Sequence, residues 1–151
     1  MSCTISENKA SYGGGLSSYG GSVTMIDCIV SGNDARMGYG GGGLGLSGQA
    51  SLTSCTISGN HGAQAGGLLI EGTATLTSCN ISGNVADHLL VTAGKAFGGA
   101  GGLKIGAGMN GKTGTATLTS CTISGNMAID HYGAGLAVTS DATLISCVIS
   151  G

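Results

Sequence analysis

The chain has 151 residues, 32 of them glycine, with no proline, no tryptophan, 3% aromatic residues and 8% charged residues. Its formal net charge of -2 and its five scattered basic residues exclude the basic patch on which nucleic-acid binding depends. Its apolar runs are far shorter than the roughly 20 residues that cross a bilayer, so we expect no membrane insertion. What remains is a single domain with a repetitive, glycine-rich fold.

One motif occurs six times along the chain, and each copy contains one cysteine. In chain order the copies read SCTISEN, DCIVSGN, SCTISGN, SCNISGN, SCTISGN and SCVISG. Successive cysteines are 24 to 27 residues apart, except for the 42 residues between Cys79 and Cys121. A period of this length indicates a solenoid in which each repeat forms one coil.

Three short strands are expected in each repeat, always in the same order. The first contains the isoleucine or valine two residues after the cysteine, the second follows a glycine cluster, and the third alternates apolar residues with threonine or serine. The second strands are expected at residues 15–17, 43–46, 67–70, 102–105 and 135–138. The third strands are expected at residues 23–25, 50–52, 74–76, 116–118 and 142–144.

Strands this short cannot bury a face alone, but parallel stacking about 4.8 Å apart makes continuous sheets around one interior. The sequence therefore predicts an all-β fold, a single parallel β-helix of about five to six coils over residues 1–151. The preference for right-handed parallel crossovers favours a right-handed coil. The long interval should hold two inserted loops, around residues 85–102 and 106–114.

Identical residues should stack from coil to coil as ladders. Corner asparagines are expected to bond to their copies in the neighbouring coils, and glycines before them and in the Gly-Gly pairs should supply positive φ. The asparagine ladder is expected at Asn8, Asn33, Asn60, Asn84 and Asn126. The cysteine ladder is expected at Cys3, Cys28, Cys55, Cys79, Cys121 and Cys147.

The repeats resemble the right-handed parallel β-helix repeat proteins of bacterial cell surfaces, including the polymorphic outer-membrane protein type. The resemblance rests on GGGL at 13–16, GGL at 66–68 and 101–103, and the repeated SGN element. It covers the whole chain and implies an adhesin-like repeat from a secreted or surface protein. The N-terminal residues themselves show no secretory signal, since they lack a basic region followed by an apolar one.

Six cysteines in a short chain could form three disulfides. In one inward column, however, their Cβ atoms should lie a coil spacing apart, which exceeds the roughly 3.8 Å that a disulfide prefers. We therefore expect free, buried thiols that pack as small apolar groups.

The third strands carry outward threonines and serines that should form regular ranks. The central rank contains Thr24, Ser51, Thr75, Thr117 and Thr143, and Thr53, Thr77 and Thr119 lie beside it. Such ranks resemble the ice-binding face of several antifreeze proteins, although threonine also simply suits exposed strand positions. Among them we select Thr75, Thr77, Thr117 and Thr119 as candidate ligand-binding residues.

Two Asp-His pairs in corresponding loops form a second candidate site. Asp87 and His88, Asp130 and His131, and Lys104 could together form a metal-binding or acid–base cluster, but the pattern favours ordinary solvated corner residues. The clustered carboxylates of the polysaccharide lyases that share this fold are missing. Gly106, Gly111, Lys112 and Thr113 match the phosphate-loop pattern, yet a strand rather than the required helix should follow.

The leading hypothesis is a non-enzymatic structural or binding module that needs no cofactor and no metal. An ice-binding protein is the first alternative, and a lyase-like carbohydrate-active enzyme that uses the loops between Asp87 and Lys112 is the second. Ice or carbohydrate surfaces are the candidate ligands. Self-association by end-to-end stacking is the expected partnership, because open coil ends leave strand edges unpaired.

Overall fold

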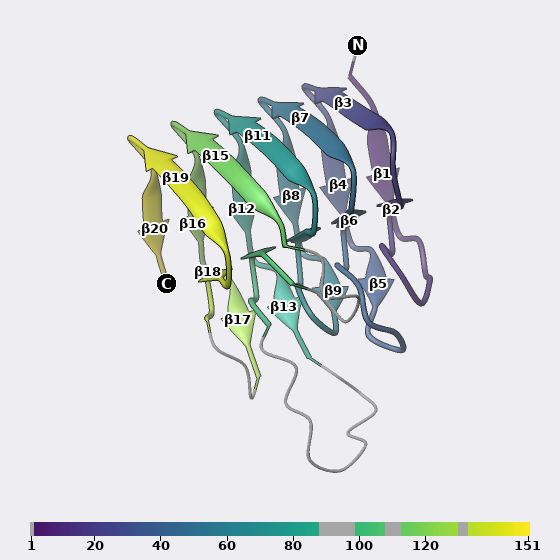
Figure 1. Cartoon of the computed structure of the whole chain (residues 1–151). Helices are drawn as coiled ribbons and strands as arrows, with labels where there is room; N and C mark the ends of the chain where they lie inside the picture. The colour runs from purple at the N-terminus through teal and green to yellow at the C-terminus, as the bar shows by residue number, and fades with distance from the viewer. Residues whose placement is uncertain (1, 88–98, 108–112, 130–132) are drawn as a thin grey trace.

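The computed structural model describes residues 2–87, 99–107, 113–129 and 133–151. These residues form 20 short strands and no helix, and every strand pairing among them is parallel. Figure 1 shows the strands stacked as successive coils along one axis, with the two ends of the described chain at opposite ends of the stack. The predicted parallel β-helix is therefore confirmed.

Each coil passes through four sheets, which we number in chain order. Sheet 1 contains the strands that follow the cysteines, namely β1 (Thr4–Ser6), β4 (Ile29–Ser31), β8 (Thr56–Ser58), β12 (Asn80–Ser82), β16 (Thr122–Ser124) and β20 (Val148–Ser150). Sheet 2 contains β5 (Asp34–Ala35), β9 (His61–Gly62), β13 (Val85–Ala86) and β17 (Met127–Ala128).

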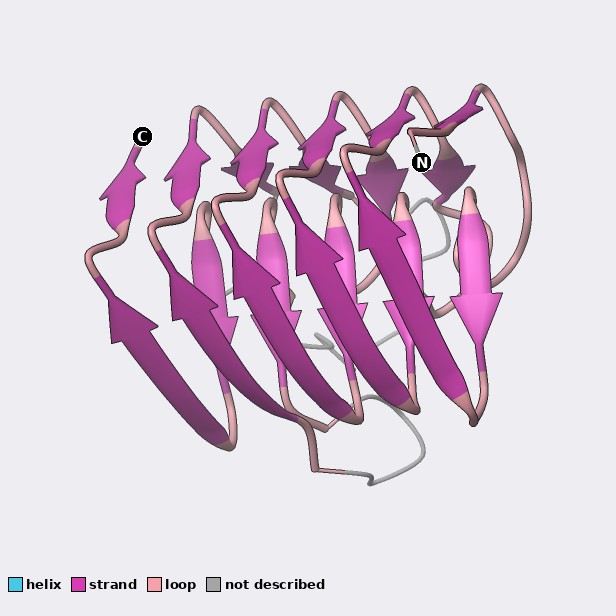
Figure 2. Ribbon diagram, turned by 90° about the horizontal axis from the view of Figure 1, so that it is seen from above, coloured by secondary structure: helices cyan, strands magenta, loops and turns pink. Residues whose placement is uncertain are grey.

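The other two sheets contain five strands each. Sheet 3 contains β2 (Leu16–Ser18), β6 (Leu44–Leu46), β10 (Leu68–Ile70), β14 (Leu103–Ile105) and β18 (Leu136–Val138). Sheet 4 contains β3 (Ser22–Ile26), β7 (Gln49–Thr53), β11 (Thr73–Thr77), β15 (Thr115–Thr119) and β19 (Asp141–Ile145). Figure 2 shows the long strands of sheet 4 side by side with little twist between neighbours.

The prediction of three strands in each coil was incomplete, because sheet 2 was not expected. Its strands contain only two residues. Two residues cannot show the alternation by which a strand is recognised in a sequence. Val85 and Ala86 belong to this sheet, and Ala100 bridges Ala65 and Gly133, so both ends of the expected 85–102 insertion lie within the coil. Residues 88–98 and 108–112 lie outside the described residues.

The interior consists of stacked apolar side chains from sheets 1, 3 and 4. Fully buried side chains of this size stabilise a fold by roughly 1.5–3 kcal/mol each. On sheet 1 the column Val30, Ile57, Ile81 and Ile123 has no exposed surface. Leucines and isoleucines of sheets 3 and 4 complete the core, including Leu44, Leu52, Leu68, Leu76, Leu103 and Leu118.

The asparagine ladder runs unbroken through five coils at the corner after sheet 1. The side-chain amide of each asparagine donates to the Oδ1 atom of the next, at 3.0 Å from Asn8 to Asn33 and 2.9 Å from Asn33 to Asn60. The same Oδ1 atoms accept the backbone N–H of the preceding asparagine, for example 3.0 Å from Asn60 to Asn84. The ladder therefore satisfies polar groups that the bend would otherwise bury unpaired.

Two kinds of residue adopt the left-handed backbone conformation at the corners. Glycines before the asparagines do so as predicted, for example Gly59 with a φ of 62°. Serines before the cysteines, such as Ser78 with a φ of 53°, do so as well, and this was not predicted. The expected positive φ is wrong for the pair Gly66 and Gly67. Glycine is needed there because a Cβ atom on Gly67 would lie 2.6 Å from the carbonyl oxygen of Gly102 and 3.0 Å from Cγ of Asn84.

Candidate functional site

The outer surface of sheet 4 presents three columns of side chains that are in register across all five strands. We call this surface the hydroxyl face. Its central column is Thr24, Ser51, Thr75, Thr117 and Thr143. The downstream column is Ile26, Thr53, Thr77, Thr119 and Ile145, and the upstream column is Ser22, Gln49, Thr73, Thr115 and Asp141.

The hydroxyl face exists because the third strand of each coil alternates strictly between buried and outward residues. In β11 the side chains of Ala74 and Leu76 are buried, whereas Thr73 and Thr75 are exposed and Thr77 is half-buried. Parallel, in-register pairing then repeats each outward residue about every 4.8 Å along the axis, and neighbouring columns lie about 6.6 Å apart. Coil geometry thus converts one sequence pattern into a two-dimensional array.

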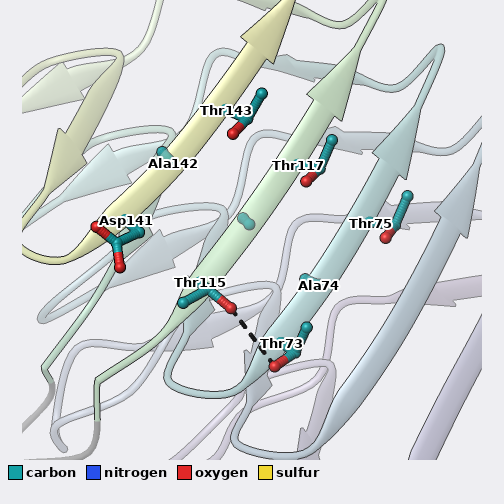
Figure 3. A pocket seen from close by; sticks show the side chains of 9 residues that line it. Thr73, Ala74, Thr75, Thr115, Thr117, Asp141, Ala142 and Thr143 are labelled. Carbon is teal, nitrogen blue, oxygen red and sulfur yellow. Dashed lines mark hydrogen bonds between the residues drawn. The ribbon is translucent and has the colours of Figure 1, made fainter.

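Three threonines of the central column are oriented alike. Figure 3 shows Thr75, Thr117 and Thr143 with their hydroxyl groups on the same side and their methyl groups on the other. In the upstream column the Thr115 hydroxyl turns toward that of Thr73, to which it donates a long hydrogen bond of 3.5 Å. β-Branched side chains have few rotamers, so this order does not depend on a ligand.

A shallow trough runs between the central and upstream columns. Over β11, β15 and β19 it has a volume of about 320 Å³, with threonine hydroxyls on both sides and the backbone at Ala74, Ala116 and Ala142 as its floor. A second hollow of about 230 Å³ continues it over β3, β7 and β11. Thr73 and Thr75 line both hollows, so the trough extends along the axis of the stack.

The hydroxyl face is almost uncharged. Asp141 is the one charged residue among its outward positions, all of which are described, and it lies on the last strand. The face therefore offers hydroxyl groups and methyl groups in a fixed arrangement, which suits an extended polar but uncharged surface rather than an ion.

The sequence located two of the three columns of this face. Thr75, Thr77, Thr117 and Thr119 all lie on it in the expected register. The upstream column was missed, although the signal was present, because the alternation of β11 and β15 extends two residues further back to Thr73 and Thr115.

Of the five residues proposed for an acid–base site, the structure describes only Asp87 and Lys104. Asp87 follows β13 and is half-buried, whereas His88, Asp130 and His131 lie outside the described residues. Lys104 is only 4% exposed and donates a 3.2 Å hydrogen bond to Oε1 of Gln64. Burial lowers the pKa of Lys104. Its ammonium group therefore does not face open solvent beside Asp87.

A charged cluster on sheet 2 was not anticipated. Asp34 accepts hydrogen bonds from Nε and Nη2 of Arg36 at 3.1 and 2.8 Å, and Nζ of Lys9 lies 3.6 Å from it. The hydrogen-bonded Arg36 guanidinium lowers the pKa of Asp34 well below its usual range. The sequence did not indicate this cluster, because Lys9 and Asp34 are far apart in the chain and meet only when the coils stack.

All six cysteines are free thiols. Four of them, Cys28, Cys55, Cys79 and Cys121, are at most 3% exposed. The expected burial is wrong for the two end coils, where Cys3 is exposed and Cys147 is half-buried. Burial is the main cause that raises the pKa of Cys55.

Among the described residues no group of three or more histidine, cysteine or acidic side chains forms a metal site. In the phosphate-loop match, strand β15 follows Thr113, whereas Gly111 and Lys112 are not described.

The described part of the chain contains no helix that is long and apolar enough to cross a membrane. The family model described as right handed beta helix region matches residues 1–149. No curated protein and no solved structure shows significant similarity to the chain. The match spans nearly the whole chain and agrees with the stacked parallel coils, so the protein belongs to the right-handed β-helix family.

Proposed function

We propose that this protein is a non-enzymatic binding module that adsorbs to ice through its hydroxyl face. The observation that carries the proposal is the in-register array of threonines on β7, β11, β15 and β19 with aligned hydroxyl groups in the central column. A ligand that matches such an array must itself repeat in two dimensions. The crystalline surface of ice repeats in this way and exposes only water.

Preorganisation supports the proposal. Binding to a periodic surface loses affinity when side chains must be ordered first. Threonine has a stiff χ1 angle, and here the sheet also fixes the backbone beneath it. The hydroxyl groups can therefore take the place of lattice waters at little cost in entropy, while the methyl groups fill the space between them.

The neutrality of the face also supports binding rather than catalysis. Proton transfer requires a positioned acid or base, and Asp141 at the edge is the only titratable side chain of the face. An uncharged face also avoids the strong hydration of ions, which would hold liquid water against the lattice.

The test is the shape and growth of single ice crystals in solutions of the purified protein. Replacing both Thr75 and Thr117 by tyrosine puts two bulky rings in the centre of the face, and we expect the thermal hysteresis to disappear. The matched control is Thr122→Tyr on sheet 1, an exposed strand threonine outside the face, which should keep full activity. Circular dichroism checks that both variants keep the fold.

Three outcomes would overturn the proposal. They are a wild-type protein without any effect on ice, a double variant that remains as active as the wild type, and a Thr122→Tyr control that is equally impaired. If the protein bound insoluble crystalline polysaccharide and not ice, it would still be a binding module, but the proposed ligand would be wrong. Sedimentation of the protein with such a polysaccharide distinguishes that case.

A further inference from the structure

The cysteines of the ladder do not all make the same contact. The thiols of Cys55, Cys79, Cys121 and Cys147 contact backbone carbonyl oxygens at 3.3 to 3.5 Å. Neighbouring thiols also contact one another, as Cys79 and Cys121 do. Cys3 donates to the sulfur atom of Cys28 across a distance of 2.9 Å between the two Sγ atoms. This distance lies inside the van der Waals contact of two sulfur atoms and is longer than the disulfide bond of about 2.05 Å.

The backbone around this pair permits a bond. β1 and β4 pair in register from Thr4 and Ile29 onward, which places Cys3 opposite Cys28. Neighbouring parallel strands lie about 4.8 Å apart, and disulfides join residues whose Cα atoms are about 4.4–6.8 Å apart. The Cβ atoms of a ladder pair are expected about one strand spacing apart, slightly more than the roughly 3.5–4.5 Å usual in disulfides, so the end of β1 must move toward β4 for the bond to close.

The position of Cys3 in the fold makes the pair both movable and reachable. β1 is the edge strand of sheet 1 and is held by β4 alone. Closing the gap between the two sulfur atoms from 2.9 Å to about 2.05 Å therefore disturbs only one neighbouring strand. Cys3 is exposed, whereas Cys28 is 3% exposed. The hydrogen bond between them raises the pKa of Cys3 and lowers the pKa of Cys28. Cys3 therefore reacts first because it is exposed, and the lowered pKa favours the Cys28 thiolate as the second nucleophile.

We propose that Cys3 and Cys28 form a disulfide bond that fastens the first coil to the second. The reaction uses a small disulfide such as oxidised glutathione as its oxidant. The exposed Cys3 thiol loses its proton to solvent, and the resulting thiolate attacks one glutathione sulfur and releases one reduced glutathione. The Cys28 thiolate then attacks the Cys3 sulfur of the mixed disulfide and releases the second, so that two thiols become one disulfide and two thiols of glutathione are produced.

The test is peptide mapping of the reduced protein after incubation with oxidised glutathione. Trypsin cleaves after Lys9 and Arg36, so Cys3 and Cys28 fall in the separate peptides 1–9 and 10–36. We expect these two peptides to be joined, with a mass two hydrogen atoms below their sum. The number of thiols that react in denaturant should fall by two from the original six.

Two variants separate this reaction from general oxidation. Cys3→Ser should abolish the joined peptide and leave Cys28 as a thiol, whereas Cys55→Ser, which removes a buried ladder thiol outside the pair, should leave the joined peptide unchanged. The proposal is overturned if the folded wild-type protein keeps all six thiols. It is equally overturned if peptide 1–9 joins to a second copy of itself, which would reveal a bond between molecules.

Discussion

The asparagine ladder should be the most sensitive polar element of the fold, and Asn60 lies at its centre. This side chain has no exposed surface. Its Nδ2 donates to the carbonyl oxygen of Val30 and to Oδ1 of Asn84, each at 3.0 Å. Its Oδ1 accepts from the backbone N–H and from Nδ2 of Asn33, at 3.0 and 2.9 Å. Replacement by alanine removes all of these bonds at once.

A buried hydrogen bond contributes about 1 kcal/mol net to stability. Buried donors and acceptors that lose their partner add a desolvation penalty. We therefore expect Asn60→Ala to lower the free energy of unfolding by about 4 kcal/mol, which is a large part of the stability of a domain. Asn8→Ala at the exposed end removes only the bond from its Nδ2 to Asn33 and should cost about 1 kcal/mol. Asn60→Asp should cost more than alanine, because a carboxylate oxygen would face two acceptors.

The assay is urea unfolding followed by far-UV circular dichroism, with Asn80→Ala as the control. Asn80 is an exposed asparagine on β12, so its replacement should leave the midpoint within error. A loss below about 1 kcal/mol for Asn60→Ala, or equal losses for Asn60→Ala and Asn8→Ala, would refute the claim that the ladder stabilises the bend.

Two further predictions concern the corners and the charged cluster. Gly67→Ala should cost about 3 kcal/mol, because its Cβ atom would lie 2.6 Å from the carbonyl oxygen of Gly102 and would also press on Asn84. Gly59→Ala meets open space at a φ of +62° and should cost about 1 kcal/mol. Equal losses of stability in urea unfolding would contradict this packing argument. Arg36 lowers the pKa of Asp34, so their ion pair should stabilise the fold fully above about pH 4 and lose its effect as the pH falls further. Asp34→Asn should then cost about 1 kcal/mol at pH 7 and less at pH 3, whereas a loss that does not depend on pH would contradict this origin.

The repeat made most of the fold predictable, because aligning the cysteines also aligns every other column. Ile57, Ile81 and Ile123, for example, stack as expected, as do the asparagines and the outward threonines. The same alternation also places Thr73 and Thr115 on the outward side, two residues before Thr75 and Thr117. Periodicity thus determines both the core and the hydroxyl face.

Features that depend on contacts between coils or on local backbone strain were harder to predict. The left-handed conformation of Ser78 could not be inferred from a residue that usually avoids positive φ. The burial of Lys104 between the core residues Leu103 and Ile105 of β14 could not be inferred, because a sequence does not reveal what covers the outer side of a sheet. The cluster of Lys9, Asp34 and Arg36 arises only from stacking.

The most direct test of ice binding is the uptake of the protein into slowly growing ice. The hydroxyl face has no lysine among its outward positions, so an amine-reactive fluorophore labels the protein elsewhere. We predict that the labelled wild type and the Thr122→Tyr control are concentrated in the ice, whereas the variant with tyrosine at positions 75 and 117 stays in the liquid. Exclusion of the wild type from the ice, like that of an ordinary protein, would contradict the account.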